Sequence, residues 1–249
     1  MEKVKVSAVS YTNTLPFIYG LQHSDVMQHI DLALDVPSEC ARKLIDGRAD
    51  LGIVPVAALL DIPYPHIVSD FCLGASGPVN SVFIFSEMPI EEIRSIRLDA
   101  QSRTSNGLAQ VLLRHYWKRE VLVVNQGEAD AYVEIGDRTF GKRNLHPYAY
   151  DLSLYWEKFT GLPFAFAVWT ANRALPDSFI QLFNKALAYG VDHRETVIDQ
   201  LPPRLDFDYR HYLMECIDYQ YDQAKNEAVT LYLKLLKSLK NIPVANKTI

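Results

Sequence analysis

The feature that most constrains the fold of this chain is a strand–helix–strand order that occurs twice. Residues 4–9 alternate apolar and polar side chains as a half-buried strand does, and residues 30–36 form a second expected strand. A helix is expected between Pro37 and Gly47, and residues 51–55 follow it as a short buried strand. Strands that alternate with helices predict an α/β protein with mostly parallel sheets.

The second copy of this order covers residues 96–133. Strands are expected at 96–99 and 121–124, with a helix between them. Gly127-Glu128-Ala129-Asp130 precedes the next strand, as Gly47-Arg48-Ala49-Asp50 does in the first copy. A Gly-x-Ala-Asp match is common in helix-to-strand loops, so it supports a repeat only together with the order of elements. We therefore expect two lobes of like architecture, with a ligand between them beyond the carboxyl ends of the strands.

Two extended apolar segments are expected to connect the lobes as hinge strands. Residues 80–86 run out of the first lobe, and residues 163–169 return to it. The rest of the chain is expected to be helical, with two apolar faces formed by Phe179, Leu182, Phe183, Ala186 and Leu187 and by Leu213, Ile217, Ala224, Ala228, Leu231 and Leu235. Packed back on the first lobe, these helices predict a discontinuous domain, 1–86 plus 170–249, around an inserted domain, 87–169.

The charge of the chain excludes some classes of partner. With 25 basic and 30 acidic residues the formal net charge is -5, so no global field attracts nucleic acid or an anionic membrane. An anionic ligand must then be held by local groups. The start of the sequence lacks a secretory signal pattern, and no stretch approaches the roughly 20 apolar residues of a membrane span. We expect a cytoplasmic protein; its oligomeric state is unknown from the sequence.

Cysteine and histidine usage predicts neither a disulfide framework nor a metal site. Cys40, Cys72 and Cys216 are odd in number and far apart, which fits a reducing compartment. The seven histidines include no i,i+4 pair, and the chain has no C-x-x-C motif. We expect no metal and no cofactor.

Six motifs in a fixed order carry a resemblance to a known family. They are Tyr11-Thr12-Asn13-Thr14-Leu15-Pro16, the Gly-x-Ala-Asp unit with its strand at 47–55, Gly77-Pro78-Val79-Asn80-Ser81-Val82, Ser102-Arg103-Thr104-Ser105, Ile135-Gly136-Asp137 and the apolar run at 161–169. Each motif alone is weak, whereas the ordered set is specific. With this set the chain resembles the chorismate dehydratase family, which acts in the futalosine route to menaquinone.

The resemblance implies a two-lobed fold of the type II periplasmic-binding-protein kind, used as a cytoplasmic enzyme. The reaction it implies converts chorismate into 3-[(1-carboxyvinyl)oxy]benzoate and water. Two positions depart from the family pattern: Val56 replaces a usual serine, which removes a possible hydroxyl contact to substrate, and Thr12 replaces a usual leucine. After Asp206 the likeness is loose, so no site residue is carried over there.

Ser102 to Ser105 is the best candidate for holding an anionic substrate. If a helix begins here, its free N–H groups and the positive end of its dipole face the cleft, and the hydroxyl groups add donors. The alternative is an ordinary helix cap with a solvated Arg103. The resemblance favours substrate binding by Thr104 and Ser105, with Arg103 as the weaker candidate.

Asn13 and Ser81 are the candidate catalytic residues, because the resemblance assigns them to the site. Without it, Asn13 is a turn former and Ser81 a hinge-strand serine bonded to the backbone. Tyr11 and Asp137 are candidate substrate-binding residues; their alternatives are core packing for Tyr11 and loop ordering or helix capping for Asp137.

The expected mechanism needs no strong protein base. Loss of a ring proton and the ring hydroxyl makes the ring aromatic, and the enolpyruvyl carboxylate of the substrate itself can take the proton. Catalysis then depends on holding the eliminating conformer, excluding water and stabilising the departing oxygen. The alternatives are a solute-binding protein of the same fold, the related 1,4-dihydroxy-6-naphthoate synthase, and the effector domain of a transcription regulator, which would carry a helix-turn-helix segment.

Overall fold

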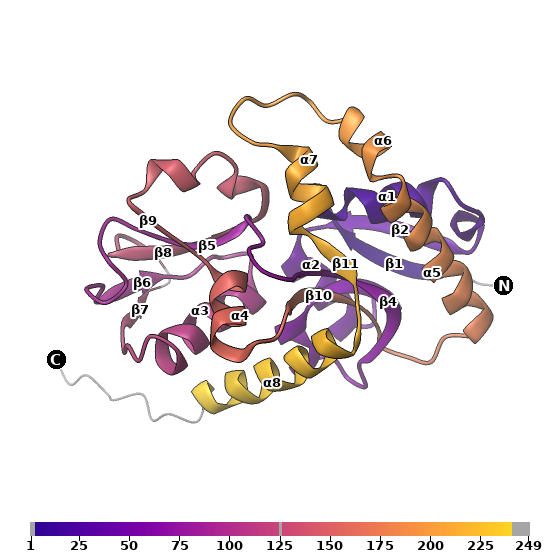
Figure 1. Ribbon diagram of the computed structural model, residues 1–249. Helices are drawn as coiled ribbons and strands as arrows, with labels where there is room; N and C mark the ends of the chain where they lie inside the picture. The colour runs from indigo at the N-terminus through magenta and orange to yellow at the C-terminus, as the bar shows by residue number, and fades with distance from the viewer. Residues whose placement is uncertain (1–2, 125, 241–249) are drawn as a thin grey trace.

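The chain folds into two lobes, each built around its own β-sheet (Figure 1). The computed structural model describes residues 3–124 and 126–240. The first sheet has the strand order β11-β4-β10-β3-β1-β2, and the second has the order β7-β6-β8-β5-β9. The α/β class and the two-lobed arrangement expected from the sequence are both confirmed.

The first sheet mixes parallel and antiparallel strands. β1 is parallel to β2 and β3, whereas β10 runs antiparallel to β3 and β4, and β11 antiparallel to β4. Its strands are β1 (Val4–Val9), β2 (Ile30–Asp35), β3 (Leu51–Pro55), β4 (His66–Ala75), β10 (Phe164–Ala171) and β11 (Asp218–Gln220).

The second sheet repeats the topology of the first around its own central strand. β6 is parallel to β7 and β8, and β5 runs antiparallel to β8 and β9. Its strands are β5 (Val82–Ser86), β6 (Ser95–Arg97), β7 (Leu122–Val124), β8 (Ala131–Ile135) and β9 (Tyr148–Asp151). The order β2-β1-β3-β10 thus matches β7-β6-β8-β5, so the expected repeat is a repeat of structure.

The Gly-x-Ala-Asp units have the same task in both lobes. Gly47 and Gly127 have the positive φ values of 69° and 89° that an L side chain rarely adopts. Asp50 then accepts the backbone N–H of Lys5 at 2.9 Å, and Asp130 accepts that of Ser95 at 3.0 Å. Each aspartate therefore ties the loop before the third strand to the start of the central strand.

Helices cover both sheets and connect the strands. The α-helices are α1 (Leu15–Gln22), α2 (Pro37–Ile45), α3 (Arg103–His115), α4 (Leu152–Thr160), α5 (Asp177–Asp192), α6 (Arg194–Asp199), α7 (Tyr209–His211) and α8 (Gln223–Lys240). Short 3₁₀ turns lie at η1 (Thr12–Thr14), η2 (Asp25–Gln28), η3 (Val56–Leu60), η4 (Gly136–Thr139) and η5 (Arg143–Leu145), and a π-helical turn forms η6 (Tyr212–Cys216). Cys40, Cys72 and Cys216 are buried and free of disulfides.

The two expected hinge strands belong to different sheets. β5 lies in the second sheet and β10 in the first, so the chain passes between the sheets in residues 76–81 and returns through α4. The predicted division into 1–86 plus 170–249 and 87–169 stays a prediction. β5, which this division assigns to the first domain, pairs with β8 and β9 of the second sheet.

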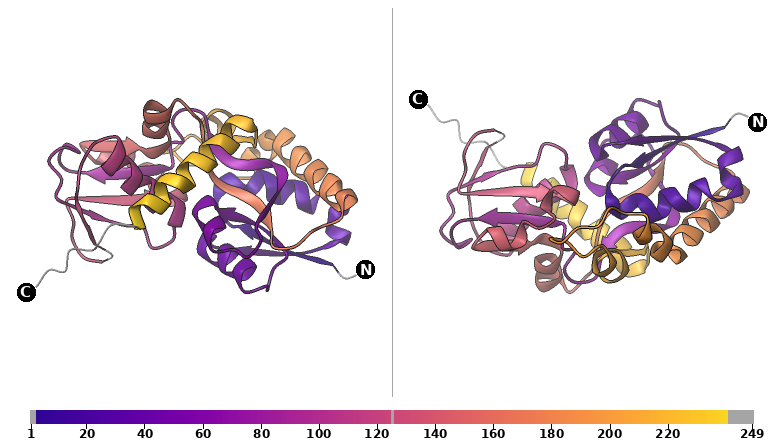
Figure 2. Two further views of the ribbon diagram at one scale, coloured as in Figure 1. Left: turned by 90° about the horizontal axis from the view of Figure 1, so that it is seen from below. Right: turned by 90° about the horizontal axis from the view of Figure 1, so that it is seen from above.

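The expectation of an entirely helical tail is wrong between η6 and α8. Leu213 lies in η6 and Ile217 has extended backbone (φ -86°, ψ 121°), so neither shares a helical face with Leu231. Residues 218–220 instead form β11, because β4 offers them a sheet edge with free backbone groups. α8 then packs against η3 and β10 of the first lobe and α3 of the second, and Figure 2 shows it running along both.

No helix among the described residues combines the length and apolar character needed to cross a bilayer.

α1 packs closely against α5 at Gly20, and this contact gives a first prediction. A Cβ added at Gly20 would lie 2.0 Å from the carbonyl oxygen of Ala186, which is backbone and cannot yield cheaply. We expect Gly20→Ala to lower the free energy of unfolding by about 2–3 kcal/mol in chemical denaturation. The control is Gly47→Ala, whose added Cβ meets nothing within 4 Å and whose cost of about 1 kcal/mol is backbone strain alone. Equal losses in the two variants would contradict the steric explanation.

Candidate functional site

A cavity lies between the lobes where strands of both sheets end. The space in it that the centre of a water-sized sphere can reach is about 70 Å³, so the cavity is narrow. Val9 and Pro55 bring in the carboxyl ends of β1 and β3, and Ile135 that of β8. The remaining walls are Tyr11, Asn13, Pro37, Leu73, Gly74, Val79, Ser81, Val82, Ser102, Thr104, Ser105, Gly136, Phe166, Ala167 and Ile217.

Five of the seven residues predicted for the site line this one cavity. Tyr11 and Asn13 come from the turn after β1, Ser81 from the crossing segment before β5, and Thr104 and Ser105 from the first turn of α3. The other two, Arg103 and Asp137, do not line it.

The start of α3 presents unpaired donors to the cavity. Ser102 caps the helix by accepting the N–H of Ser105 at 3.1 Å, while the N–H groups of the first two helical residues have no acceptor within the helix. Thr104 is 1% exposed, and its Oγ1 accepts the N–H of Ala57 at 3.1 Å. Because Ala57 belongs to η3 of the first lobe, this bond joins the lobes and leaves the hydroxyl proton of Thr104 for another acceptor.

The prediction that the Arg103 side chain binds substrate is not supported by its position. Its guanidinium pairs with the carboxylate of Asp61, the residue that follows η3, and the two side chains are 42% and 40% exposed. The charge is therefore satisfied outside the cavity wall, in an ion pair between the lobes. Arg103, the residue after the capping residue Ser102, points away from the cavity because successive helix positions are turned by about 100°.

Asp137 orders the site from behind instead of lining it. Its carboxylate accepts the backbone N–H of Thr12 at 3.2 Å and the Thr12 hydroxyl at 2.9 Å. Burial raises the pKa of this carboxyl, and the two bonds from Thr12 oppose the rise. Asp137 thus holds the turn that carries Tyr11 and Asn13, and Thr12, which departs from the family pattern, supplies the hydroxyl partner.

The other departure from the pattern, Val56, also proves to be structural. Its side chain is fully buried at the start of η3 and does not belong to the cavity wall. The expectation that valine here removes a hydroxyl contact to substrate therefore has no support in the geometry.

Two tyrosines that loosely match the family's ending, but were not predicted as site residues, support the candidate catalytic residues. The Tyr212 hydroxyl donates to Ser81 Oγ at 2.8 Å, and the Tyr219 hydroxyl donates to the Asn13 carbonyl at 2.9 Å. Both rings are nearly fully buried. They lie after Asp206, where the family likeness is loose, and no local pattern marks a tyrosine that acts across more than 130 residues of chain.

The wall of the cavity carries no charged side chain among the described residues. Tyr11 donates to Gln101, and burial raises the pKa of its hydroxyl, against the opposing charge of Arg138. Arg138 is itself paired with Asp99 at 2.6 Å. Within the described chain no group of three or more His, Cys, Asp or Glu side chains is placed to hold a metal ion. The cavity can therefore bind an anion through neutral donors and the end of α3.

Asp151 fixes the segment that carries Ser81. Its buried carboxylate accepts the backbone N–H groups of Val79 and Asn80 at 3.2 and 2.7 Å, and it caps α4 by accepting those of Ser153 and Leu154. Asn80 has a φ of 55°, so this turn needs such an anchor. Burial raises the pKa of the carboxyl to about 6, and the four N–H groups oppose the rise.

This pKa predicts how stability depends on pH. An unfolded aspartate titrates near pH 4, so between about pH 4 and 6 the unfolded chain loses its proton before the folded one. The contribution of Asp151 to the free energy of unfolding should fall by up to about 3 kcal/mol as the pH rises through this window. Denaturation of wild type and Asp151→Asn from pH 4 to 8 measures this contribution as the free energy of unfolding of the wild type minus that of the variant. A value that rises with pH would contradict the raised pKa.

Comparison with known proteins matches nearly the whole chain. A family model described as menaquinone biosynthesis matches residues 4–238. A chorismate dehydratase of Thermus thermophilus is 26% identical in an alignment 225 positions long, which covers 78% of this chain and 80% of that protein. A chorismate dehydratase of Campylobacter jejuni is also 26% identical, over 93% of this chain and 96% of its own length.

Solved structures share the two-lobed fold at lower identity. A protein of Archaeoglobus fulgidus superposes with a TM-score of 0.77 at 14% identity, covering 96% of this chain and 98% of its own. The periplasmic aliphatic sulphonate binding protein SsuA of Escherichia coli superposes with a TM-score of 0.63 at 15% identity, covering 98% and 94%. The expected periplasmic-binding-protein-like fold is therefore confirmed.

Proposed function

Because the chain belongs to the menaquinone biosynthesis family, we propose that it is a chorismate dehydratase, an enzyme that eliminates water from chorismate to form 3-[(1-carboxyvinyl)oxy]benzoate. The observation that carries the proposal is the gathering of Asn13, Ser81, Thr104 and Ser105 around one cavity whose wall carries no charged side chain among the described residues. Two relatives that bear this name align with most of the chain and support it. We further propose that the protein acts in the cytoplasm.

One carboxylate of chorismate binds at the start of α3. The free N–H groups of the first turn and the hydroxyls of Thr104 and Ser105 donate to it, and the positive end of the helix dipole favours its charge. In a cavity with apolar walls such as Leu73 and Phe166 these donors act more strongly than in water. The ring then lies toward Ser81 and Asn13, on the opposite wall.

The elimination breaks one C–H and one C–O bond of the ring. The enolpyruvyl carboxylate of the substrate takes the ring proton, and the electron pair of the C–H bond completes the aromatic ring as the C–O bond breaks. The carboxylic acid formed in this way returns the proton to the departing hydroxyl, which leaves as water. Ser81 and the Asn13 amide stabilise the departing oxygen by hydrogen bonds. The lobes exclude bulk water and hold the conformer in which the carboxylate reaches the proton.

A non-catalytic binding protein is the second candidate, because SsuA, a binding protein, shares the fold. Purified protein incubated with chorismate decides between the two. The enzyme produces the ultraviolet spectrum of a benzoate, with the product confirmed by mass spectrometry. Calorimetric binding of chorismate without any spectral change would favour the binding protein and refute the proposed reaction.

Substitution of the two candidate catalytic residues tests their roles. We expect Asn13→Ala and Ser81→Ala each to lower kcat roughly 100-fold, because each removes a donor to the departing oxygen. Steady-state kinetics with chorismate measures the effect. Unchanged turnover in both variants would remove these residues from the mechanism.

Arg103 gives the opposite expectation, because its side chain lies outside the cavity wall. Arg103→Gln should change kcat/KM by less than about threefold, the effect of an exposed ion pair worth under 1 kcal/mol. A rise in KM of roughly 100-fold would instead show that the guanidinium contacts a substrate carboxylate.

A further inference from the structure

Tyr212 lies directly behind Ser81, on the side away from the cavity. The Tyr212 side chain is 1% exposed and does not belong to the cavity wall, and its hydroxyl donates to Ser81 Oγ at 2.8 Å. Ser81 is also 1% exposed, so the two hydroxyls form a buried pair. The site therefore has a second layer that the proposed reaction does not yet use.

The direction of this bond determines what Ser81 can do. A hydroxyl that accepts from one side still has its own proton to donate. Across residues 3–124 and 126–240 the structure gives the Ser81 hydroxyl no protein acceptor, and Ser81 lines the cavity. Its proton is therefore available to a ligand oxygen in the cavity.

The same phenol also interacts with Asn13. Burial raises the pKa of the Tyr212 hydroxyl well above its ordinary value, and its interactions with Ser81 and with the Asn13 side chain oppose that rise. With its pKa raised in this way, the Tyr212 hydroxyl stays protonated near neutral pH, so it remains a donor. One side chain thus contacts both candidate catalytic residues.

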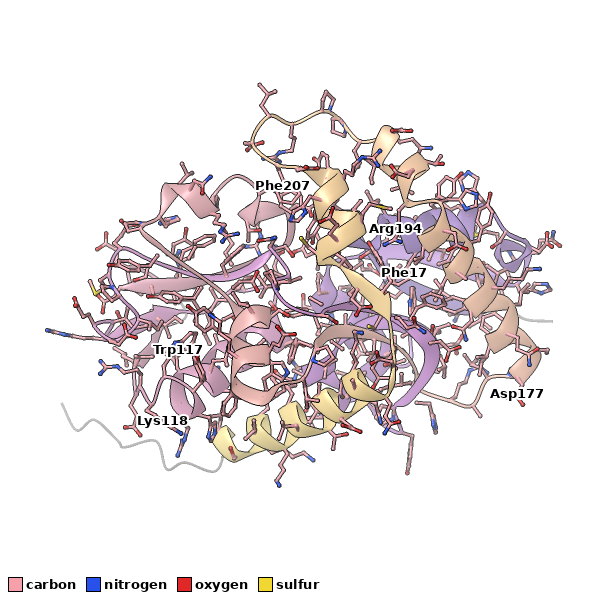
Figure 3. All side chains as sticks on the ribbon, viewed as in Figure 1. Phe17, Trp117, Lys118, Asp177, Arg194 and Phe207 are labelled. Atoms are coloured by element: carbon pink, nitrogen blue, oxygen red, sulfur yellow. The ribbon has the colours of Figure 1, made fainter. Side chains whose placement is uncertain are left out.

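An unusual backbone conformation places this phenol. Tyr212 is the first residue of the π-helical turn η6, and its carbonyl accepts the N–H of Ile217 at 3.0 Å. Such turns are rare and are frequent at functional sites. Arg194, labelled in Figure 3, holds the turn by donating to the carbonyl of Leu213 at 3.2 Å and lies over the ring of Tyr219.

The ring of Tyr212 contacts the second lobe as well. Phe140, at the end of η4, packs edge-on against it with the ring centroids 5.3 Å apart. Phe207 stacks on Phe140 with the ring centroids 3.6 Å apart, and Figure 3 shows Phe207 beside α7. The position of the phenol therefore depends on the contact between the lobes.

We propose that Tyr212 is a positioning residue, which orients the Ser81 hydroxyl so that Ser81 donates a hydrogen bond to the departing oxygen. This inference rests on the proposed function, because it assigns the departing oxygen as the acceptor. It adds a residue from the C-terminal part of the chain to the site.

The variant Tyr212→Phe removes the hydroxyl and keeps the ring. We expect kcat for chorismate to fall at least about tenfold with KM within about twofold, because binding at α3 is untouched while Ser81 is free to turn. The loss should be the same from pH 6 to 9; a loss confined to one side of a pKa would mean that Tyr212 acts as an acid or base and would overturn the proposal. Tyr150→Phe is the matched control: its hydroxyl accepts the Ile90 N–H at 2.8 Å in the second lobe, away from the cavity wall, and kcat should be unchanged.

The double variant with Ser81→Ala tests whether Tyr212 acts through Ser81. In the Ser81→Ala background, Tyr212→Phe should cause no further loss of kcat. A further tenfold loss, or a wild-type rate in the single Tyr212→Phe variant, would overturn the positioning role.

Wild type, the single variants Ser81→Ala and Tyr212→Phe, and the double variant also test the bond between the two hydroxyls without substrate. The changes in unfolding midpoint should be non-additive if the two hydroxyls are bonded, and additive changes would overturn the inference. A wild-type protein that does not convert chorismate would refute the proposed function, while the unfolding cycle would still decide whether Tyr212 fixes Ser81. The two failures are thus distinguishable.

Discussion

The site depends on two hydrogen-bonded contacts that hold the lobes together over a cavity with uncharged walls. Thr104 at the start of α3 accepts the N–H of Ala57, and Asp137 at the end of β8 accepts two donors from Thr12. The first contact joins the start of α3 in the second lobe to η3 in the first lobe. The second joins η4 in the second lobe to η1 in the first.

The repeated topology explains why the cavity lies where it does. In each lobe a central strand is flanked by two parallel neighbours, and their carboxyl ends face the partner lobe. Asp50 and Asp130 fasten the same loop in each copy, so the strand ends are fixed relative to their sheets. A ligand held there contacts backbone donors and hydroxyls, because the described cavity wall has no cationic side chain. Such a site suits a reaction that needs fixed dipoles more than a strong base.

Much of this arrangement was predictable from local patterns. The alternation of strands and helices gave the class, and local sequence placed the turn after β1 and the start of α3. The family resemblance then assigned Tyr11, Asn13, Thr104 and Ser105 to the site. Three features were not predictable in this way. β11 is three residues long and exists because β4 offers it an edge, the Arg103 side chain was assigned to the site although it pairs with Asp61, and Tyr212 reaches Ser81 from a distant part of the chain.

The salt dependence of product binding tests most directly the claim that neutral donors hold a doubly negative ligand. Isothermal titration of 3-[(1-carboxyvinyl)oxy]benzoate at 50 and 500 mM KCl measures it, since added salt screens contacts between charges far more than hydrogen bonds from neutral groups in a cavity between the lobes. The account predicts a Kd that changes less than about twofold between the two conditions. A Kd that rises tenfold or more would show that cationic side chains hold the ligand and would contradict it.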